Sequence, residues 1–206
     1  CLNNPLIYTD PSGEFWHLII GAAIGGAINW VANGADLSWE GWSYFATGAV
    51  SGALTAAFPG AAIGITAGAG AANSAIGQGF NNGWNNINLQ QVAFDGIMAG
   101  TMAYVGGEIA SKFAGPVQKL TEKISSPMLR ELIVHEASGL PFGTVMGGIM
   151  AVADGDPNTS FLDGMWSGAK KSFVTSGLSA VGSAANYSLD NKVGMLTGIP
   201  KGGEVR

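Results

Sequence analysis

The sequence predicts an all-α protein in which glycine- and alanine-rich helical hairpins pack as an irregular bundle, after a short non-helical segment at the N-terminus. Three observations predict this fold. Glycine supplies 33 of the 206 residues, and many of these glycines recur every four positions. A period of four places residues along one face of a helix, whereas a strand needs a period of two. Three stretches of the chain also resemble one another, as repeated hairpin turns would.

The expected elements follow in order along the chain. Residues 1–14 are polar and turn-forming, and glycine, alanine and apolar residues dominate from Phe15 onward. Phe58-Pro59-Gly60 is expected to break one hairpin into two helices, and Ser126-Pro127 is expected to interrupt a charged connector. The five expected parts are an N-terminal segment, glycine-rich hairpins, an amphipathic charged connector, a further glycine-rich hairpin and a flexible tail, over residues 1–14, 15–111, 112–136, 137–190 and 191–206.

Rows of glycines are the predicted helix-packing surfaces. Each glycine costs about 1 kcal/mol relative to alanine in a solvated helix, so such a row needs the close approach of another helix or a membrane to offset it. The longest rows are the three-glycine runs at 60–68 and 139–147. The glycines expected to pack are Gly21, Gly25, Gly48, Gly52, Gly60, Gly64, Gly68, Gly96, Gly100, Gly139, Gly143, Gly147, Gly164 and Gly168.

The hairpin turns are predicted at three similar stretches, ANGADLSWEG (32–41), NNGWNNINLQQVAFDG (81–96) and ADGDPNTSFLDG (153–164). Each has a glycine suited to ending a helix, a polar loop and a Ser, Thr or Asn suited to capping the next helix. Asn88 and Gln91 have the spacing of a capping box. The second helices are expected to start at Trp39-Glu40-Gly41, Phe94-Asp95-Gly96 and Leu162-Asp163-Gly164.

Catalytic and metal-binding motifs are not recognisable in the sequence. The pair His135-Glu136 lacks the second histidine of a zinc-protease helix, because Gly139 stands at that position, and surface electrostatics is the preferred interpretation. A single cysteine excludes a disulfide framework and a cysteine zinc site. DGDPNTSFLDG lacks the Gly and Glu of a calcium loop and is interpreted as an acidic turn. We therefore expect no catalytic residue, metal or cofactor.

Charge and aromatic residues bear on possible partners. A net charge of −5 with nine Lys and Arg argues against nucleic-acid binding. Residues 41–94 carry no charged side chain, and residues 15–35 are long enough to span a bilayer, which needs about 20 residues. The tryptophans fit either a membrane-interface belt or packing in a soluble bundle; they are Trp16, Trp30, Trp39, Trp42, Trp84 and Trp166.

The opening stretch CLNNPLIYTDPSGE resembles the end of the core domain of RHS/YD-repeat proteins, which commonly finish in a run such as N-N-P-L-x-Y-x-D-P-S/D-G. The following FWHLIIGAAIGGAINWVANG resembles the glycine-rich segment found after such cores in Bacteroidetes-type proteins. In that family the repeats build a β-shell around a variable C-terminal toxin, which is delivered to competing cells, often by type VI secretion. The resemblance implies a delivered effector region, with the upstream shell and a cognate immunity protein as partners. A start at Cys1 is expected of a fragment or a processed product.

Three functions are consistent with these residues. The leading hypothesis is a membrane-inserting or pore-forming effector built on glycine-zipper helices, with the target-cell membrane as partner. The second is a non-catalytic glycine-rich helical module that packs in the RHS shell or assists translocation from it. The third is an enzyme toxin of unrecognised type. The repeated hairpins favour the first two, because duplicated scaffolds rarely carry one catalytic centre.

Overall fold

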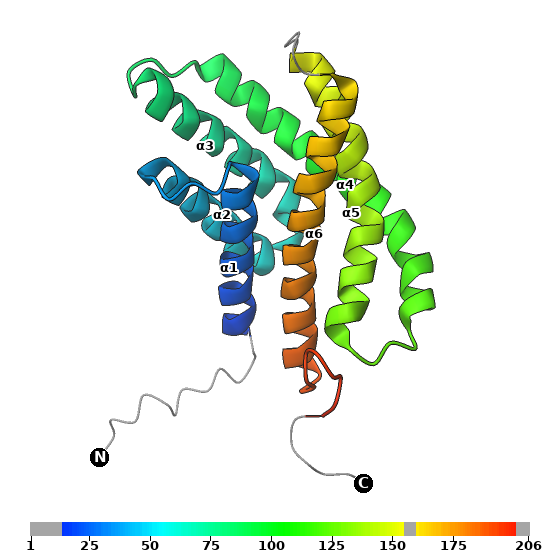
Figure 1. Cartoon of the computed structure of the whole chain (residues 1–206). Coiled ribbons are helices and arrows are strands. Elements are labelled where there is room, and N and C mark those ends of the chain that lie inside the picture. The colour runs from blue at the N-terminus through cyan, green and yellow to red at the C-terminus, as the bar shows by residue number, and fades with distance from the viewer. Residues whose placement is uncertain (1–13, 155–159, 201–206) are drawn as a thin grey trace, which may run out of the picture.

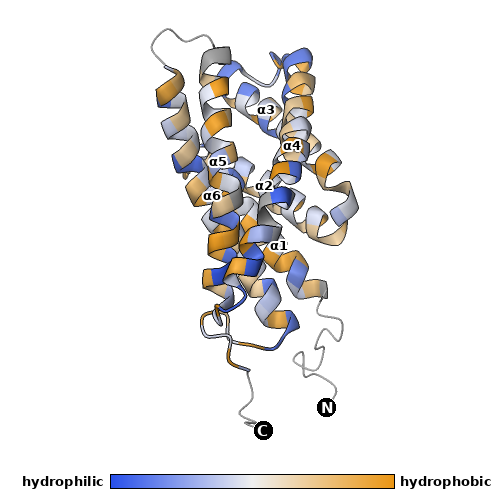
Figure 2. Cartoon of the chain, turned by 90° about the vertical axis from the view of Figure 1, so that its right-hand side faces the viewer, coloured by the Kyte–Doolittle hydropathy of each residue, from blue (hydrophilic) through white to orange (hydrophobic). Residues whose placement is uncertain are grey.

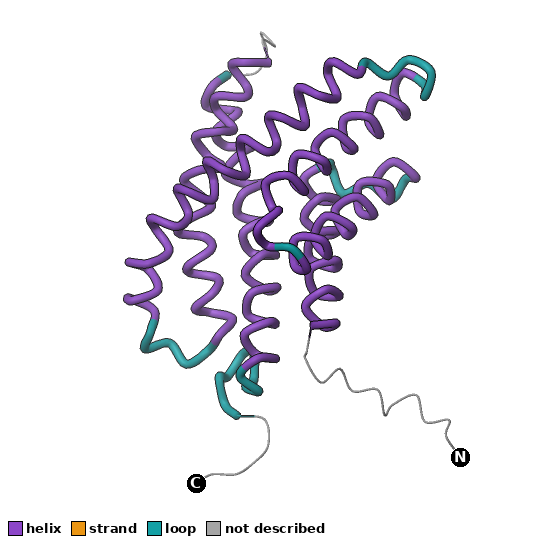
Figure 3. The backbone as a smooth tube through the Cα atoms, turned by 180° about the vertical axis from the view of Figure 1, so that it is seen from behind, coloured by secondary structure: helices purple, strands orange, loops and turns teal. Residues whose placement is uncertain are grey.

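A computed structural model describes residues 14–154 and 160–200 of the protein. Within these residues there are seven helices and no strand, which confirms the predicted all-α class. Figure 3 shows long helices joined by short loops. The helices are α1 (Glu14–Ala32), α2 (Trp39–Ala57), the short 3₁₀ helix η2 (Pro59–Ala61), α3 (Ala62–Asn82), α4 (Leu89–Thr121), α5 (Pro127–Asp154) and α6 (Phe161–Asp190).

The six α-helices form three antiparallel hairpins, α1–α2, α3–α4 and α5–α6, and each pair makes the most extensive contacts of the fold. The hairpins meet through α2 with α3, α4 with α5, and α6 with α1, so that each hairpin contacts the other two. Figure 1 shows α1 beside α6, with α2, α3 and α4 inclined to them. The predicted bundle of hairpins is therefore correct.

The second helix of each hairpin, α2, α4 or α6, starts at a polar cap. Ser38 Oγ accepts a hydrogen bond from the Gly41 amide at 3.2 Å, and Asn88 Oδ1 accepts from the Gln90 amide at 3.0 Å. Ser160 and Asp163 cap α6 as a reciprocal capping box. Each side chain satisfies backbone N–H groups that the first helical turn leaves unpaired. The caps expected at the three hairpin turns are present.

The second hairpin turn differs from the prediction in two respects. The side-chain amide of Gln91 donates to Asp95 Oδ1 at 2.8 Å. The main-chain N–H of Asn88 donates to Gln78 Oε1 at 2.6 Å. The backbone group that a capping box would use is therefore already bonded to α3. Because Asn88 acts as the cap, α4 begins at Leu89, and Phe94-Asp95-Gly96 lies inside the helix rather than at its start.

Prolines mark the other boundaries. Pro59 starts η2 between α2 and α3, at the break expected there. Pro127 is the first residue of α5, where its missing N–H would have no helical partner. The expected connector, residues 112–136, thus consists of the end of α4, a turn and the start of α5. The third hairpin accordingly begins earlier than the predicted residue 137.

Residues 191–200 form turns against the start of α5, in contrast to the flexible tail that we expected. The Met128 N–H donates to the Met195 carbonyl at 2.9 Å, and Val193 and Pro200 form an isolated antiparallel bridge. These main-chain hydrogen bonds are a tertiary contact that the polar, glycine-containing sequence did not indicate. Most of the segment that resembles an RHS core end, residues 1–13, lies outside the described residues, as do 201–206.

Candidate functional site: glycine-packed hairpins with an apolar exterior

Glycines bring α1 and α2 into backbone contact. A Cβ atom added at Gly25 would lie less than 3.0 Å from the Gly48 carbonyl oxygen, and one added at Gly48 would meet the Gly25 carbonyl oxygen equally closely. Gly21 and Gly52 show the same reciprocal relationship. No residue with a side chain fits at these positions without moving the opposite backbone. The four glycines therefore form a packed interface, as predicted.

The α5–α6 hairpin has an equivalent interface. Added Cβ atoms at Gly147 and Gly164 would each lie less than 3.0 Å from the other's carbonyl oxygen, and one at Gly168 would meet the Gly143 carbonyl oxygen. At the next position along the row, Gly139 faces Ser176. The predicted glycine row at 139–147 thus packs against a second small-residue row on α6.

The α3–α4 hairpin packs less tightly. Gly96 and Gly100 of α4 face Ala67, whose carbonyl oxygen and Cβ atom respectively lie 3.0 Å from the added Cβ positions. On α3 the close contact comes from Gly70, which faces Ala99. Each of these glycines faces an alanine, whereas glycines of the other two hairpins face one another. The helices α3 and α4 therefore meet through methyl groups as well as through backbone atoms.

The row Gly60, Gly64 and Gly68 packs against no other helix in the described part of the chain. An added Cβ atom at any of these positions would have no heavy atom within 4 Å beyond its own helical neighbours. The physical reason is that α3 presents Ala67 and Gly70 to α4, so the glycine row points elsewhere. The prediction of a helix-packing role within this chain is wrong for these three glycines.

A reciprocal amide pair joins the first hairpin to the second. Asn29 of α1 and Asn73 of α3 donate to each other's carbonyl oxygens at 3.0 and 2.7 Å. The Asn29 amide also donates to the main-chain oxygen of Tyr44 in α2 at 2.6 Å. One side chain therefore bonds three helices. Hydrogen bonds between part-buried amides of this kind fix the register of the helices that they join.

A second polar cluster lies between α5 and α6. His135 Nε2 is 3.0 Å from Ser183 Oγ and 3.8 Å from Glu131 Oε2, and the Arg130 guanidinium lies 4.3 Å from the centre of the Tyr187 ring. Burial lowers the pKa of His135, partly opposed by Glu131. This segment is therefore part of a helix interface, and the interpretation of His135-Glu136 as surface electrostatics is wrong.

Glu136 is the least satisfied polar group of that cluster. Both of its carboxylate oxygens are buried and have no hydrogen-bond partner among the described residues. Burial raises the pKa of the Glu136 carboxyl group. An unpaired carboxylate is costly when it is removed from water, so burial disfavours the ionised form of Glu136 relative to a glutamate in water. No sequence pattern indicates this, because the burial of Glu136 depends on how α5 and α6 meet.

The large apolar side chains lie mainly on the outside. Among the described residues, the buried apolar side chains are few; they are Tyr44, Val134, Ala180 and Ala184, together with the fully buried Pro127. Figure 2 shows apolar residues spread along the helices instead of collected in one region. Soluble monomers rarely expose apolar surface so widely. The fold therefore places small residues at the closest helix contacts and leaves many large apolar residues exposed.

The tryptophans take part in this exposure. Five of the six predicted membrane-interface tryptophans are exposed, with Trp39 the most exposed at 83%; they are Trp16, Trp39, Trp42, Trp84 and Trp166. Trp30 is half-buried, and its indole N–H donates to the Asp36 carbonyl at 2.6 Å. Most of the aromatic rings are thus available to another surface.

One described helix has the length and composition to cross a membrane. It is Phe15–Ala32, within α1, and very little of it is buried. One such helix is weak support for a membrane span, since signal sequences and core helices share these properties. His17 Nε2 at its start lies 3.1 Å from Asp190 Oδ1 at the end of α6.

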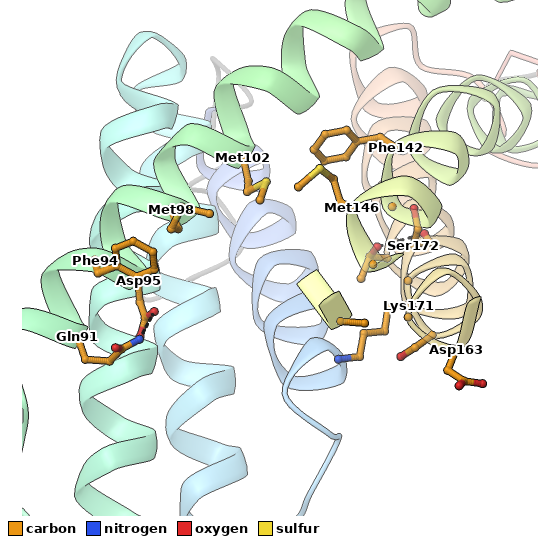
Figure 4. A pocket seen from close by; sticks show the side chains of 17 residues that line it. Gln91, Phe94, Asp95, Met98, Met102, Phe142, Met146, Asp163, Lys171 and Ser172 are labelled. Carbon is orange, nitrogen blue, oxygen red and sulfur yellow. Dashed lines mark hydrogen bonds between the residues drawn. The ribbon is translucent and has the colours of Figure 1, made fainter. Parts of the chain in front are cut away.

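A groove between α4 and the α5–α6 hairpin is a further feature that sequence reasoning missed. It has a volume of about 1100 Å³. Figure 4 shows Met102, Met146 and Phe142 together toward one end and polar side chains toward the other, where Phe94 lies beside Asp95 and Gln91. No group of three metal-ligating side chains gathers anywhere in the described ranges 14–154 and 160–200. Comparisons with protein-family models, curated proteins and solved structures gave no match.

Proposed function

We propose that this chain is the membrane-inserting effector region of an RHS-type polymorphic toxin. The observation that carries the proposal is the reversed distribution of residues, with glycines at the helix interfaces and large apolar side chains outside. In water, burial of large apolar side chains is the main stabilising term. In a bilayer that term is absent between helices, and small residues at close interfaces drive association instead.

The first hairpin is the best candidate to enter the bilayer. It contains the apolar stretch Phe15–Ala32 and the reciprocal glycine contacts between α1 and α2. Asn29 links α1 to both α2 and α3, and its side-chain amide is hydrogen-bonded to Asn73 and to the main-chain carbonyl of Tyr44. A satisfied amide between helices is compatible with lipid surroundings. The exposed tryptophans would then lie at the membrane interface.

The biological setting of the proposal comes from the resemblance of residues 1–14 to an RHS core end. It includes delivery to a target cell, an upstream β-shell that covers the apolar exterior before delivery, and a cognate immunity protein in the producing cell. The shell or the immunity protein would shield the same exposed side chains that we assign to lipid contact.

The second candidate is the non-catalytic module that packs in the shell or assists translocation. The observation in its favour is that α1 is the only described helix with the properties of a membrane span. Such a module needs its apolar exterior covered by the shell and does not need to enter lipid.

Dye release from liposomes tests the proposal. Protein comprising residues 1–206 is mixed with vesicles that contain a self-quenched dye, in anionic and in neutral lipid. We expect release that depends on protein concentration. Absence of release from both lipids would refute membrane insertion and favour the packing module. Expression in a bacterial periplasm, with membrane potential as the readout, separates depolarisation from enzymatic toxicity, which would kill cells without depolarising them.

A further inference from the structure

The groove between the second and third hairpins has two chemically different ends. Met98 and Met102 of α4 face Phe142 and Met146 of α5 at the apolar end (Figure 4). Beyond this end α4 and α5 come into contact, because the Phe142 ring lies 3.2 Å from the position of an added Cβ on Gly106. Methionine side chains are flexible and polarizable, so they adapt to an apolar ligand of irregular or variable shape.

The acidic groups that line the other end are already bonded. Asp95 accepts hydrogen bonds from Ser74 Oγ at 2.6 Å and from Gln91 Nε2 at 2.8 Å, one on each carboxylate oxygen. Asp163 belongs to the capping box with Ser160, and Figure 4 shows its carboxylate directed away from the groove. These hydrogen bonds hold both carboxylates in place, and a cationic ligand would have to compete with them.

Lys171 is the uncommitted charge of the groove. Its side chain extends from α6 into the space that faces α4 (Figure 4). Its ammonium group has no ion pair or hydrogen bond with any residue in the described part of the chain. The neighbouring Lys170 is different, because its ammonium group lies 5.7 Å from the centre of the Trp166 ring. The groove therefore combines an apolar end with the solvent-exposed ammonium group of Lys171, in a lining that also contains the carboxylates of Asp95 and Asp163.

We propose that this groove binds one anionic amphiphile with a single long alkyl chain, such as a long-chain carboxylate. The alkyl chain lies between the methionines and Phe142, and the anionic head group accepts a charge-assisted hydrogen bond from Lys171. The volume of about 1100 Å³ is slightly above the range of ordinary ligand sites, so the groove has room for a long alkyl chain. The same chemistry is offered by a free fatty acid and by an anionic single-chain lipid in a bilayer. The proposal does not depend on membrane insertion.

The test measures binding of hexadecanoate to the full chain, by displacement of a fluorescent polyene fatty acid below the concentration at which either forms micelles. Hexadecyltrimethylammonium is the probe of opposite charge. We expect one saturable hexadecanoate site and much weaker binding of the cation. Lys171→Glu should weaken hexadecanoate binding by about tenfold or more, as expected for loss of a charge-assisted contact and its replacement by repulsion. Lys170→Glu is the matched control and should leave binding unchanged.

A second variant tests the apolar end. Met102→Trp places a larger side chain in the groove and so reduces the space for the alkyl chain. The variant should bind less hexadecanoate per protein chain, and circular dichroism checks that the helices remain. Because the outer surface is also apolar, non-specific adhesion must be distinguished. Equal binding of the two probes, or hexadecanoate binding that survives both Lys171→Glu and Met102→Trp, would overturn the proposal.

Flotation with vesicles that contain an anionic single-chain lipid distinguishes the two ligand sources. If Lys171→Glu lowers hexadecanoate binding in solution, the ligand is a free amphiphile. If it lowers only vesicle binding, the ligand is a bilayer lipid. If it lowers neither, the groove has no such site. These outcomes are separable from failure of the dye-release test, because binding in solution requires no membrane leakage.

Discussion

Gly25 and Gly48 approach so closely that the Cβ position of each falls against the carbonyl oxygen of the other. This contact lets the backbones of α1 and α2 touch, and no other residue type permits it. Gly64 has the same four-residue spacing in the sequence but faces open space. The two positions therefore provide a matched pair in which identical substitutions have opposite effects.

Gly48→Ala should destabilise the protein, whereas Gly64→Ala should stabilise it. The added methyl group at Gly48 overpacks the interface at a cost of about 1–3 kcal/mol, which exceeds the gain in helix propensity. At Gly64 the added methyl group meets no neighbour, so only the difference in helix propensity matters, and this favours alanine by up to about 1 kcal/mol. Chemical denaturation followed by circular dichroism measures both. A destabilising Gly64→Ala would show that the open row has a partner after all.

The amide pair of Asn29 and Asn73 should contribute to stability as a unit. Asn29→Leu leaves the part-buried Asn73 amide without its partner, and the loss of a partner by a fully buried group costs about 1–3 kcal/mol, which is an upper bound here. Asn29→Leu combined with Asn73→Leu should cost less than the sum of the two single changes, since neither polar group is then left unpaired. A double-mutant cycle on the free energy of unfolding measures the coupling. Additive single effects would mean that the two amides do not interact in solution.

Glu136 should make the protein less stable as the pH rises. Burial raises the pKa of its carboxyl group in the folded state, so the folded protein binds the proton more tightly than the unfolded chain. The stabilisation that comes from this bound proton is fully present below the pKa of an unperturbed glutamate, which is 4.5. It is lost as the pH rises through the pKa of Glu136 in the folded protein.

Glu136→Gln removes this proton-linked term. The variant should therefore raise the melting temperature at pH 7 and change it little at pH 4, relative to the unmodified chain. Glu108→Gln, at an exposed position of α4, is the control and should have little effect at either pH. His135 contributes in the opposite direction, because burial lowers its pKa and its stabilisation is lost as the pH falls below its unperturbed value. An equal effect of Glu136→Gln at both pH values would refute the linkage.

Local signals explain the part of the fold that the sequence predicted. The Ser160 cap and the break at Pro59 depend on residues within one or two turns of each other. A four-residue glycine period likewise identifies a helix face, but it does not say which element covers that face. The rows at 60–68 and 139–147 have the same spacing, and only the second meets a small-residue row. Tertiary arrangement decides between them.

The parts that could not be predicted all depend on how hairpins meet. Gly70 packs against Ala99 although it lies outside the four-residue row of α3. Lys171 lines the groove only because α4 and α6, from different hairpins, lie on either side of it. Glu136 is buried by contacts between helices. No spacing within one segment carries this information, since each case pairs residues that are distant in sequence.

Trp39 provides the last prediction, which concerns the exposed aromatic side chains. Trp39 is 83% exposed at the start of α2, and Leu120 is 82% exposed in the charged connector between Lys119 and Lys123. If the first hairpin enters the bilayer, Trp39 contacts the membrane interface and Leu120 stays in water. Trp39→Ala should then weaken vesicle partitioning by about tenfold, because it removes a large apolar side chain from the interface. Leu120→Ala should leave partitioning unchanged. Sedimentation with vesicles measures both, and melting temperatures confirm that the variants remain folded. Equal losses for the two variants would indicate non-specific adhesion of the whole apolar exterior and would exclude oriented insertion of the first hairpin.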